Sequence, residues 1–251
     1  MIQAEAINRV AFQEKLFLSV VSYLSSADIQ ELRHSLSEKG YVVFKNLIKH
    51  EALSVLKNEA LLLLEKYGVQ RDFLMQQTDN TPRKLINIGQ RDIKNNGGVI
   101  PELYLSPIFK SVFEAVTQEK FHDYPYQKEE YIINCLLRPS DTHGWHWDDY
   151  KYGIVIALET PQIGYGGFVQ AVPNTRWNRQ SPSVETAFLQ SNVHSFRLDE
   201  GDVYLLKTDT SMHRVFPIKE GARRIIINMV WATDDELNKE IDHSTMEAFF
   251  Q

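Results

Sequence analysis

The stretch His143-Gly144-Trp145-His146-Trp147-Asp148-Asp149-Tyr150 decides how this sequence is interpreted. Alternate side chains of a β-strand leave from the same face, so His146 and Asp148 could reach one metal ion. The spacing alone is a weak signal. Eight histidines and 33 acidic residues in a chain of 251 produce about one such pair by chance. The pair therefore needs support from the sequence around it.

Around this stretch, the second half of the chain consists of short apolar or alternating runs. They fall at residues 131–137, 153–158, 167–172, 193–198, 203–206 and 224–231. Turn-forming residues separate the runs, for example Pro139-Ser140-Asp141 and Asp199-Glu200-Gly201-Asp202. Short strands with this spacing favour a β-sandwich or barrel over alternating strand–helix units.

A third candidate ligand, His213, precedes the last of these strands. Within residues 224–231, the strand period places Arg224 and Asn228 on one face and Arg223 on the other. A polar Asn228 among apolar neighbours indicates that its face lines a wet interior. Two histidines and one carboxylate leave coordination positions open and form the facial triad suited to non-haem Fe(II). An inward arginine supplies a planar fork for a carboxylate.

These residues, together with the β pattern over residues 129–232, resemble the Fe(II)/2-oxoglutarate-dependent dioxygenases. The resemblance implies a mainly β fold with flanking helices around a double-stranded β-helix (jelly-roll, cupin-like) core. It implies that His146, Asp148 and His213 bind Fe(II). It further implies that Arg224 binds the distal carboxylate of 2-oxoglutarate, with O2 as the second co-substrate. Arg223 is the competing choice for that carboxylate.

A narrower resemblance surrounds the first ligand. Residues 143–150 are similar to the BesD-type radical halogenases, which act on free amino acids such as lysine, and to their hydroxylase relatives. In the halogenases a small residue replaces the metal-binding carboxylate and frees a position for chloride. Asp148 occupies that position here. The resemblance therefore implies hydroxylation of a free basic amino acid, most simply L-lysine at its γ-carbon (C4), and not halogenation.

The same resemblance implies five substrate contacts. Arg83 and His143 would hold the substrate carboxylate, Glu129 and Asp149 its ammonium groups, and Asn228 would be a further polar contact. The set is physically coherent because a buried charge without a partner is costly. If the strand register slips by one residue, Glu130 replaces Glu129.

The first half of the sequence is expected to be mostly helical. Apolar periodicity predicts helices over about 4–24, from Ser26 or Asp28 to Gly40, and over about 51–67, with a short strand at 41–44. The first helix is expected to bury its periodic apolar positions, which are Ile7, Val10, Ala11, Phe17, Leu18 and Val21. We expect one domain, 1–251, in which a helical part of about 1–120 buttresses a core of about 121–232. A C-terminal helix of about 234–250 follows.

Composition limits the function classes. The formal net charge of −6 disfavours nucleic acid as a partner. The single cysteine, Cys135, excludes an internal disulfide and is expected to be a buried thiol. Without a signal-peptide pattern or a membrane-spanning run, a cytoplasmic enzyme with a small-molecule substrate is expected. The alternatives are a 2-oxoglutarate oxygenase for another molecule and a non-catalytic metal-binding jelly roll.

Overall fold

The computed structural model describes residues 2–123 and 126–250, and the side chains from residue 9 onward within those ranges. Eleven strands of the described chain form one sheet in which every pairing is antiparallel. They are β1 (Tyr41–Phe44), β2 (Val69–Met75), β3 (Thr81–Ile88), β4 (Tyr131–Leu136), β5 (Thr142–His146), β6 (Tyr152–Glu159), β7 (Val169–Pro173), β8 (His194–Phe196), β9 (Val203–Lys207), β10 (Ser211–Val215) and β11 (Arg224–Val230).

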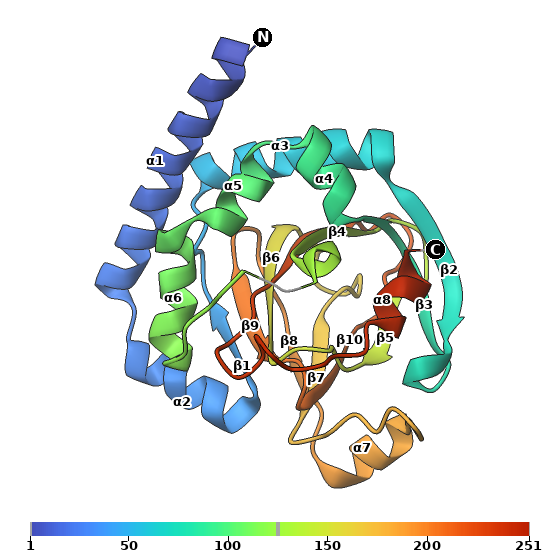
Figure 1. The fold of residues 1–251 in the computed structure, drawn as a ribbon. Coiled ribbons are helices and arrows are strands. Elements are labelled where there is room, and N and C mark those ends of the chain that lie inside the picture. Colours follow the sequence, from blue (N-terminus) through green and yellow to red (C-terminus); the bar gives the residue numbers. More distant parts are fainter. Residues whose placement is uncertain (1, 124–125, 251) are drawn as a thin grey trace.

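The order of strands across the sheet is β1-β9-β6-β11-β4-β3-β5-β10-β7-β8, with β2 beside β3. Strand β3 joins the two halves because residues 86–88 pair with β4 and residues 83–84 pair with β5. The sheet curves around an interior that stays open on one side (Figure 1). The expected mainly β, jelly-roll-like core with flanking helices is confirmed.

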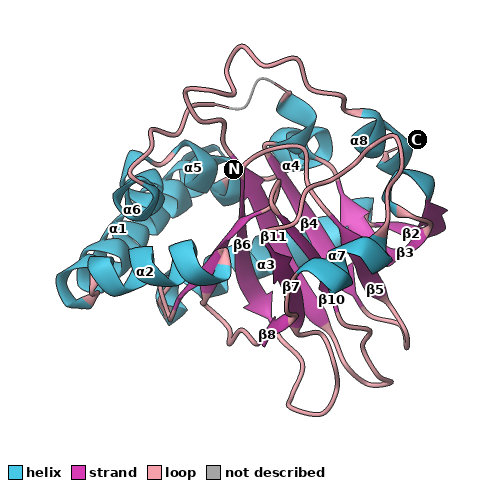
Figure 2. Ribbon diagram, turned by 90° about the horizontal axis from the view of Figure 1, so that it is seen from below, coloured by secondary structure: helices cyan, strands magenta, loops and turns pink. Residues whose placement is uncertain are grey.

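The helices of the N-terminal half cover one outer face of this sheet, whereas the last two helices lie apart from that layer, as Figure 2 shows. The helices are α1 (Ile2–Ser26), α2 (Ile29–Lys39), α3 (His50–Tyr67), α4 (Gln90–Asn96), α5 (Val99–Leu105), α6 (Pro107–Thr117), α7 (Val184–Gln190) and α8 (Ser244–Phe249). Asp28 caps α2 by accepting from the amides of Gln30 and Glu31, and Gly40 ends it in the left-handed conformation (φ 73°). In the described chain, no helix has the length and apolarity that crossing a bilayer requires.

The main core lies between the helices and the outward face of the sheet. Ile225, Ile227 and Met229 of β11 pack into this core. Trp231, just after the strand, stacks on Tyr104 of α5 with 4.8 Å between ring centroids. Since strand side chains alternate, the other residues of β11 face the interior of the curved sheet. The apolar core thereby fixes which side chains reach the cavity.

Two expectations for the helical regions are wrong in detail. Of the six expected core positions in α1, four are exposed: Val10, Phe17, Leu18 and Val21. Ile7 lies outside the residues whose side chains are described. The helix instead buries a stripe made of Phe12, Leu16 and Val20. Both faces of α1 carry apolar residues, so periodicity could not tell which face meets α3, α5 and α6.

The C-terminal helix is also shorter than expected, since only Ser244–Phe249 is helical. Glu236 is 3% exposed and turns inward. Its carboxylate accepts from the amide and hydroxyl of Thr233 at 2.9 and 2.7 Å, and from the amide of Lys151 at 2.7 Å. These bonds hold the acidic segment in turns, so it does not continue as a helix.

The expected helical part of about 1–120 also contains a hairpin that periodicity did not show. Strands β2 and β3 pair over seven positions, from Val69–Asn87 to Met75–Thr81. Asp79 and Asn80 form the connection with positive φ angles of 61° and 54°. Asp and Asn tolerate this conformation better than other residues with a side chain. The hairpin matters because β3 carries Arg83.

Candidate metal and substrate site

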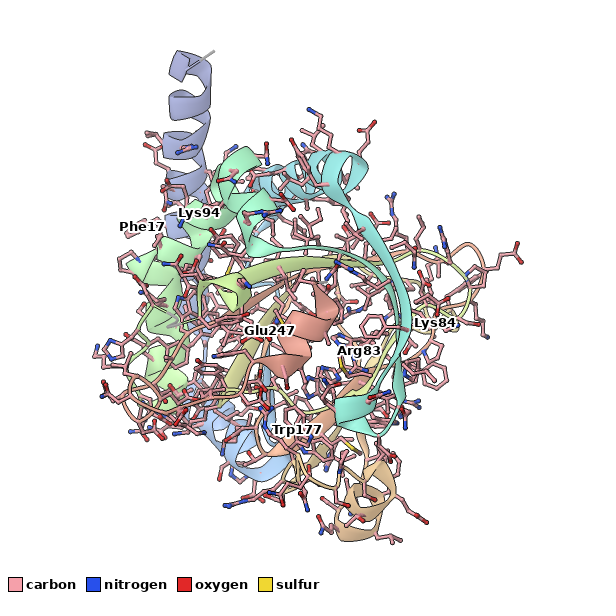
Figure 3. The ribbon with its side chains drawn as sticks, turned by 45° about the vertical axis from the view of Figure 1, so that its right-hand side comes forward. Phe17, Arg83, Lys84, Lys94, Trp177 and Glu247 are labelled. Carbon is pink, nitrogen blue, oxygen red and sulfur yellow. The ribbon has the colours of Figure 1, made fainter. Side chains whose placement is uncertain are left out.

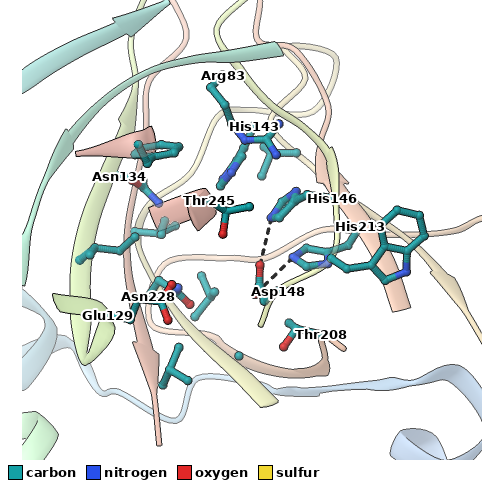
Figure 4. Close-up of a pocket in the computed structure, with 18 of the residues that line it drawn as sticks. Arg83, Glu129, Asn134, His143, His146, Asp148, Thr208, His213, Asn228 and Thr245 are labelled. Carbon is teal, nitrogen blue, oxygen red and sulfur yellow. Dashed lines mark ion pairs between the residues drawn. The ribbon is translucent and has the colours of Figure 1, made fainter. Parts of the chain in front are cut away.

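The candidate metal ligands converge because β5 and β10 are antiparallel neighbours. His146 ends β5, and His213 of β10 is paired directly with it, with 4.1 Å between the ring centroids. Asp148 follows β5. Its two carboxylate oxygens lie 3.4 Å from Nε2 of His146 and 3.8 Å from Nε2 of His213 (Figure 4). All three donors lie within 4.8 Å of one another.

Backbone carbonyls fix the orientation of both imidazoles. Nδ1 of His146 lies 2.7 Å from the carbonyl oxygen of Gly144, and Nδ1 of His213 lies 3.0 Å from that of Ser211. A carbonyl only accepts, so each Nδ1 carries the proton and donates it. Each Nε2 therefore presents a lone pair toward Asp148, as in histidines that ligate metals.

The protonation states suit a metal ion. Burial raises the pKa of the Asp148 carboxyl to about 7, against the opposing effect of the Arg83 guanidinium. Burial lowers the pKa of His213 to about 4 and holds that of His146 well below its usual value. The imidazoles are thus neutral at pH 7, the form that ligates, and a cation would stabilise ionised Asp148. Two imidazoles and one carboxylate on one side fit Fe(II) with open positions.

Arg224 lies inside the cavity, on the face of β11 that alternation predicts. Its residue is 4% exposed, and its Nη2 has no hydrogen-bond partner among the described residues. Ile226 and Asn228 line the same cavity. Arg223 lies on the outer face, where its Nε and Nη2 donate to Glu159 at 2.6 and 2.8 Å. Arg224 is therefore the guanidinium available to a carboxylate in the cavity.

Arg83 provides a second buried guanidinium. It lies on the inner side of β3, whereas Lys84 points outward (Figure 3). Its Nη1 donates to Thr81 Oγ1 and its Nη2 to Thr78 Oγ1, both at 3.0 Å. In the described chain it makes no ion pair with a carboxylate. Burial lowers the pKa of Arg83 to about 9, with Asp148 opposing the effect, so the side chain stays charged at pH 7.

His143 lies between Arg83 and the metal ligands. It is paired in register with Arg83, and its ring stacks on that of His146 with 4.1 Å between centroids. Burial, with help from the nearby Arg83 charge, holds the pKa of His143 well below its usual value. His143 is therefore neutral and would contact a carboxylate by a hydrogen bond.

Two carboxylates line another part of the cavity. Glu129 belongs to the short 3₁₀ helix Gln127–Glu129 before β4. The neighbouring Glu130 accepts instead from Nε2 of Gln90 at 2.8 Å and does not line the cavity. Asp149 is paired with Arg179 and also accepts from Thr245 Oγ1 at 3.3 Å. Of these two neighbouring glutamates, Glu129 is therefore the one that could contact a ligand in the cavity.

The structure brings all nine sequence-predicted site residues to one cavity: Arg83, Glu129, His143, His146, Asp148, Asp149, His213, Arg224 and Asn228. Their individual roles in binding stay predictions. The three candidate metal ligands lie together. Arg224 and Glu129 line the cavity, whereas Arg223 and Glu130 do not.

Several lining residues had no signal in the sequence. Thr78, Asn134, Tyr204 and Thr245 lie far from the motifs in sequence and reach the cavity only through the fold. Only Asn134 could have been noticed, as a polar residue inside the apolar run 131–137. His243 has no ligand spacing in the sequence, yet in the structure it forms a second close group of possible ligands with Glu129 and Asp149.

The sequence matches a family model described as Halogenase D over residues 24–251. No curated protein sequence is significantly similar to the chain. The expected resemblance to the halogenases and their relatives is thus confirmed at the level of the family.

Solved structures share the fold at low sequence identity. The epimerase SnoN, solved with Fe3+, alpha ketoglutarate and nogalamycin RO, has a TM-score of 0.64 and 12% identity, covering 81% of this chain and 83% of its own. AviO1 from Streptomyces viridochromogenes Tue57 has a TM-score of 0.64 and 16% identity, covering 86% of this chain and 98% of its own. A Trichoplax adhaerens prolyl hydroxylase bound to a hypoxia inducible factor peptide has a TM-score of 0.59 and 13% identity, covering 84% of this chain and 93% of its own.

Proposed function

Because the chain belongs to the halogenase D family, we propose that it is an Fe(II)/2-oxoglutarate-dependent hydroxylase of a free basic amino acid. L-lysine, oxidised at its γ-carbon (C4), is the proposed substrate. One observation carries the proposal. A two-histidine, one-carboxylate group lies in a cavity with two buried guanidinium groups, Arg83 and Arg224, neither of which has a described carboxylate partner.

His146, Asp148 and His213 would hold the iron. When bound there, Fe(II) with 2-oxoglutarate and O2 supplies an oxidation in which succinate, carbon dioxide and a hydroxylated substrate are formed. The chain supplies position and charge. Arg224 would bind the distal carboxylate of 2-oxoglutarate, because its unpartnered Nη2 is directed to a buried cavity where a charge-assisted hydrogen bond is strong.

The second guanidinium supports an amino-acid substrate. Thr78 and Thr81 hold Arg83 in place, and neutral His143 lies beside it, so these groups together suit a substrate carboxylate. Glu129 and Asp149 would take ammonium groups. A zwitterion with a second ammonium matches one cationic and two anionic contacts, and a buried site favours such charge matching.

Asp148 distinguishes hydroxylation from halogenation in this proposal. Its carboxylate lies within 3.8 Å of both histidine Nε2 atoms, so it would occupy the position that a halide needs.

A cytoplasmic location also stays a prediction, consistent with the buried free thiol of Cys135.

The test is succinate formation with Fe(II) and 2-oxoglutarate across a panel of free amino acids, followed by mass spectrometry of the product. L-lysine should give one mole of hydroxylysine per mole of succinate. His146→Ala and His213→Ala should abolish turnover with an unchanged circular dichroism spectrum, whereas His34→Ala, an exposed control, should not. Turnover of another compound would replace the substrate, and no succinate with any compound would favour a non-catalytic metal-binding protein.

A further inference from the structure

Asp149, one of the two proposed ammonium contacts, already has a cationic partner in this structure. Its side chain is 2% exposed and forms an ion pair with Arg179. Arg179 comes from the connection between β7 and α7, outside the curved sheet. The partly exposed guanidinium of Arg179 is thus paired with a carboxylate that lines the cavity.

Besides its ion pair with Asp149, Arg179 has two further contacts at the surface. Its side chain is 33% exposed, and its Nη1 lies 3.6 Å from a carboxylate oxygen of Asp242, whose side chain is 60% exposed. Its guanidinium carbon lies 3.8 Å from the centroid of the Trp177 ring, a geometry in which a cation is attracted to the ring face. In Figure 3, Trp177 lies below Glu247 of the C-terminal helix. Arg179 could therefore leave Asp149 and keep Asp242 and Trp177.

The charge balance favours such an exchange. A carboxylate as buried as that of Asp149 is costly without a cationic partner, and Arg179 is that partner. A substrate ammonium at Asp149 would bring a second cation to the same carboxylate. Because the two cations repel each other, the ammonium competes with Arg179 for Asp149.

We propose that Arg179 is a specificity-determining residue that acts as an exchangeable counter-ion for Asp149. This inference rests on the proposed function, since it requires an ammonium-bearing substrate. The substrate ammonium replaces the guanidinium at Asp149, and Arg179 then keeps only its contacts with Asp242 and the face of Trp177. A substrate without that ammonium leaves Arg179 in place, and the cavity then keeps its own cation.

The experiment compares dissociation constants, measured by calorimetry without oxygen on protein loaded with Fe(II) and 2-oxoglutarate. The ligands are L-lysine, L-norleucine, which lacks the side-chain ammonium, and 6-aminohexanoate, which lacks the α-ammonium. Arg179→Ala should strengthen L-lysine binding roughly threefold to tenfold, because the competing cation is gone. In the same variant, one of the two analogues should bind more weakly than it does to the wild-type protein. It is the analogue that lacks the ammonium group which contacts Asp149, because that carboxylate then has neither Arg179 nor an ammonium as its partner.

A second variant tests whether Asp242 stabilises Arg179 after the guanidinium has left Asp149. Asp242→Asn removes the charge but keeps an oxygen that can accept from the Ser244 amide, as Asp242 does at 2.9 Å. This change should weaken L-lysine binding in the wild-type background and have no effect in the Arg179→Ala background. Arg176→Ala, an exposed arginine on the same connection, is the matched control and should leave all three constants unchanged.

The outcomes separate the two proposals. If the wild-type protein binds no basic amino acid, the proposed function fails and the exchange fails with it. If L-lysine binds to the wild-type protein but Arg179→Ala weakens all three ligands by the same factor, Arg179 only holds the connection in place. That result would overturn the exchange and leave the proposed function intact.

Discussion

At the scale of single residues, two guanidinium groups govern the chemistry that the cavity can accept. Arg83 and Arg224 are both buried, and both line the cavity. A buried cation without an anionic partner is costly, so both guanidinium groups favour carboxylate ligands. Under the proposed function, 2-oxoglutarate would bring its distal carboxylate to Arg224, and an amino-acid substrate would bring its carboxylate to Arg83.

A pair of adjacent arginines tests the co-substrate contact. Arg224→Ala should raise the KM for 2-oxoglutarate roughly thirtyfold, because one buried charge-assisted pair is lost. Arg223→Ala should change it less than about twofold, because Arg223 pairs with Glu159 on the outer face. Steady-state kinetics of both variants measures the two constants. The opposite order would show that Arg223 holds the co-substrate.

Cys135 should be inert in the folded protein. Cys135 lies on β4 between β11 and β3, its thiol is buried in the main core, and burial raises its pKa to about 11. The reactive form is the thiolate, so iodoacetamide at pH 8 should label the native protein far more slowly than protein unfolded in guanidinium chloride. Mass spectrometry over time measures both rates. Equal rates would mean that β4 is not packed as described.

At the scale of elements, a side chain of one helix accepts hydrogen bonds from the free amides at the start of another helix and so holds the two helices together. Glu59 of α3 accepts from three successive amides at the start of α5, those of Gly98, Val99 and Ile100, at 2.8, 2.9 and 2.9 Å. These amides have no partner within their own helix. The anion also complements the positive end of the helix dipole. Since α5 carries Tyr104, which packs on Trp231, this cap supports the sheet beneath the cavity.

Glu59→Ala should lower the free energy of unfolding by about 2 kcal/mol, because three amides lose a charged acceptor. Chemical denaturation followed by circular dichroism measures the change. Glu65→Ala, an exposed position on the same helix, is the control and should change stability by less than about 0.5 kcal/mol. Equal losses in the two variants would contradict the capping role.

At the scale of the whole molecule, the cavity gathers charged side chains inside a barrel that the helices stabilise through apolar packing. A metal ion and a dicarboxylate bind only the folded form, since the unfolded chain has no assembled site. Their binding should therefore stabilise the whole fold.

Thermal unfolding without oxygen tests this coupling. Saturating Fe(II) followed by 2-oxoglutarate should each raise the Tm, together by roughly 5–10 °C, as expected for ligands at about 100 times their Kd. Arg224→Ala should keep the increment from the metal and lose most of that from 2-oxoglutarate. His213→Ala should lose both. A wild-type Tm that does not respond to either addition would refute the proposed site.

The candidate ligands and the strand faces could be predicted from the sequence. His146 and Asp148 were paired by their spacing, Arg224 was separated from Arg223 by strand alternation, and the family resemblance supplied the roles of these residues and of His213. Strand alternation is a local signal because the period of two is a property of the backbone. The short strand 41–44, the helix ending at Gly40 and the helix near 51–67 followed from equally local signals.

Only the tertiary structure decided the rest, because the remaining features depend on contacts between segments distant in sequence. The buried face of α1 depends on which neighbours it meets. The early end of the C-terminal helix depends on Glu236 turning toward Lys151. The ion pair of Asp149 with Arg179 joins positions 30 residues apart. Interactions of this kind depend on the completed fold, in which burial makes a charge require a partner.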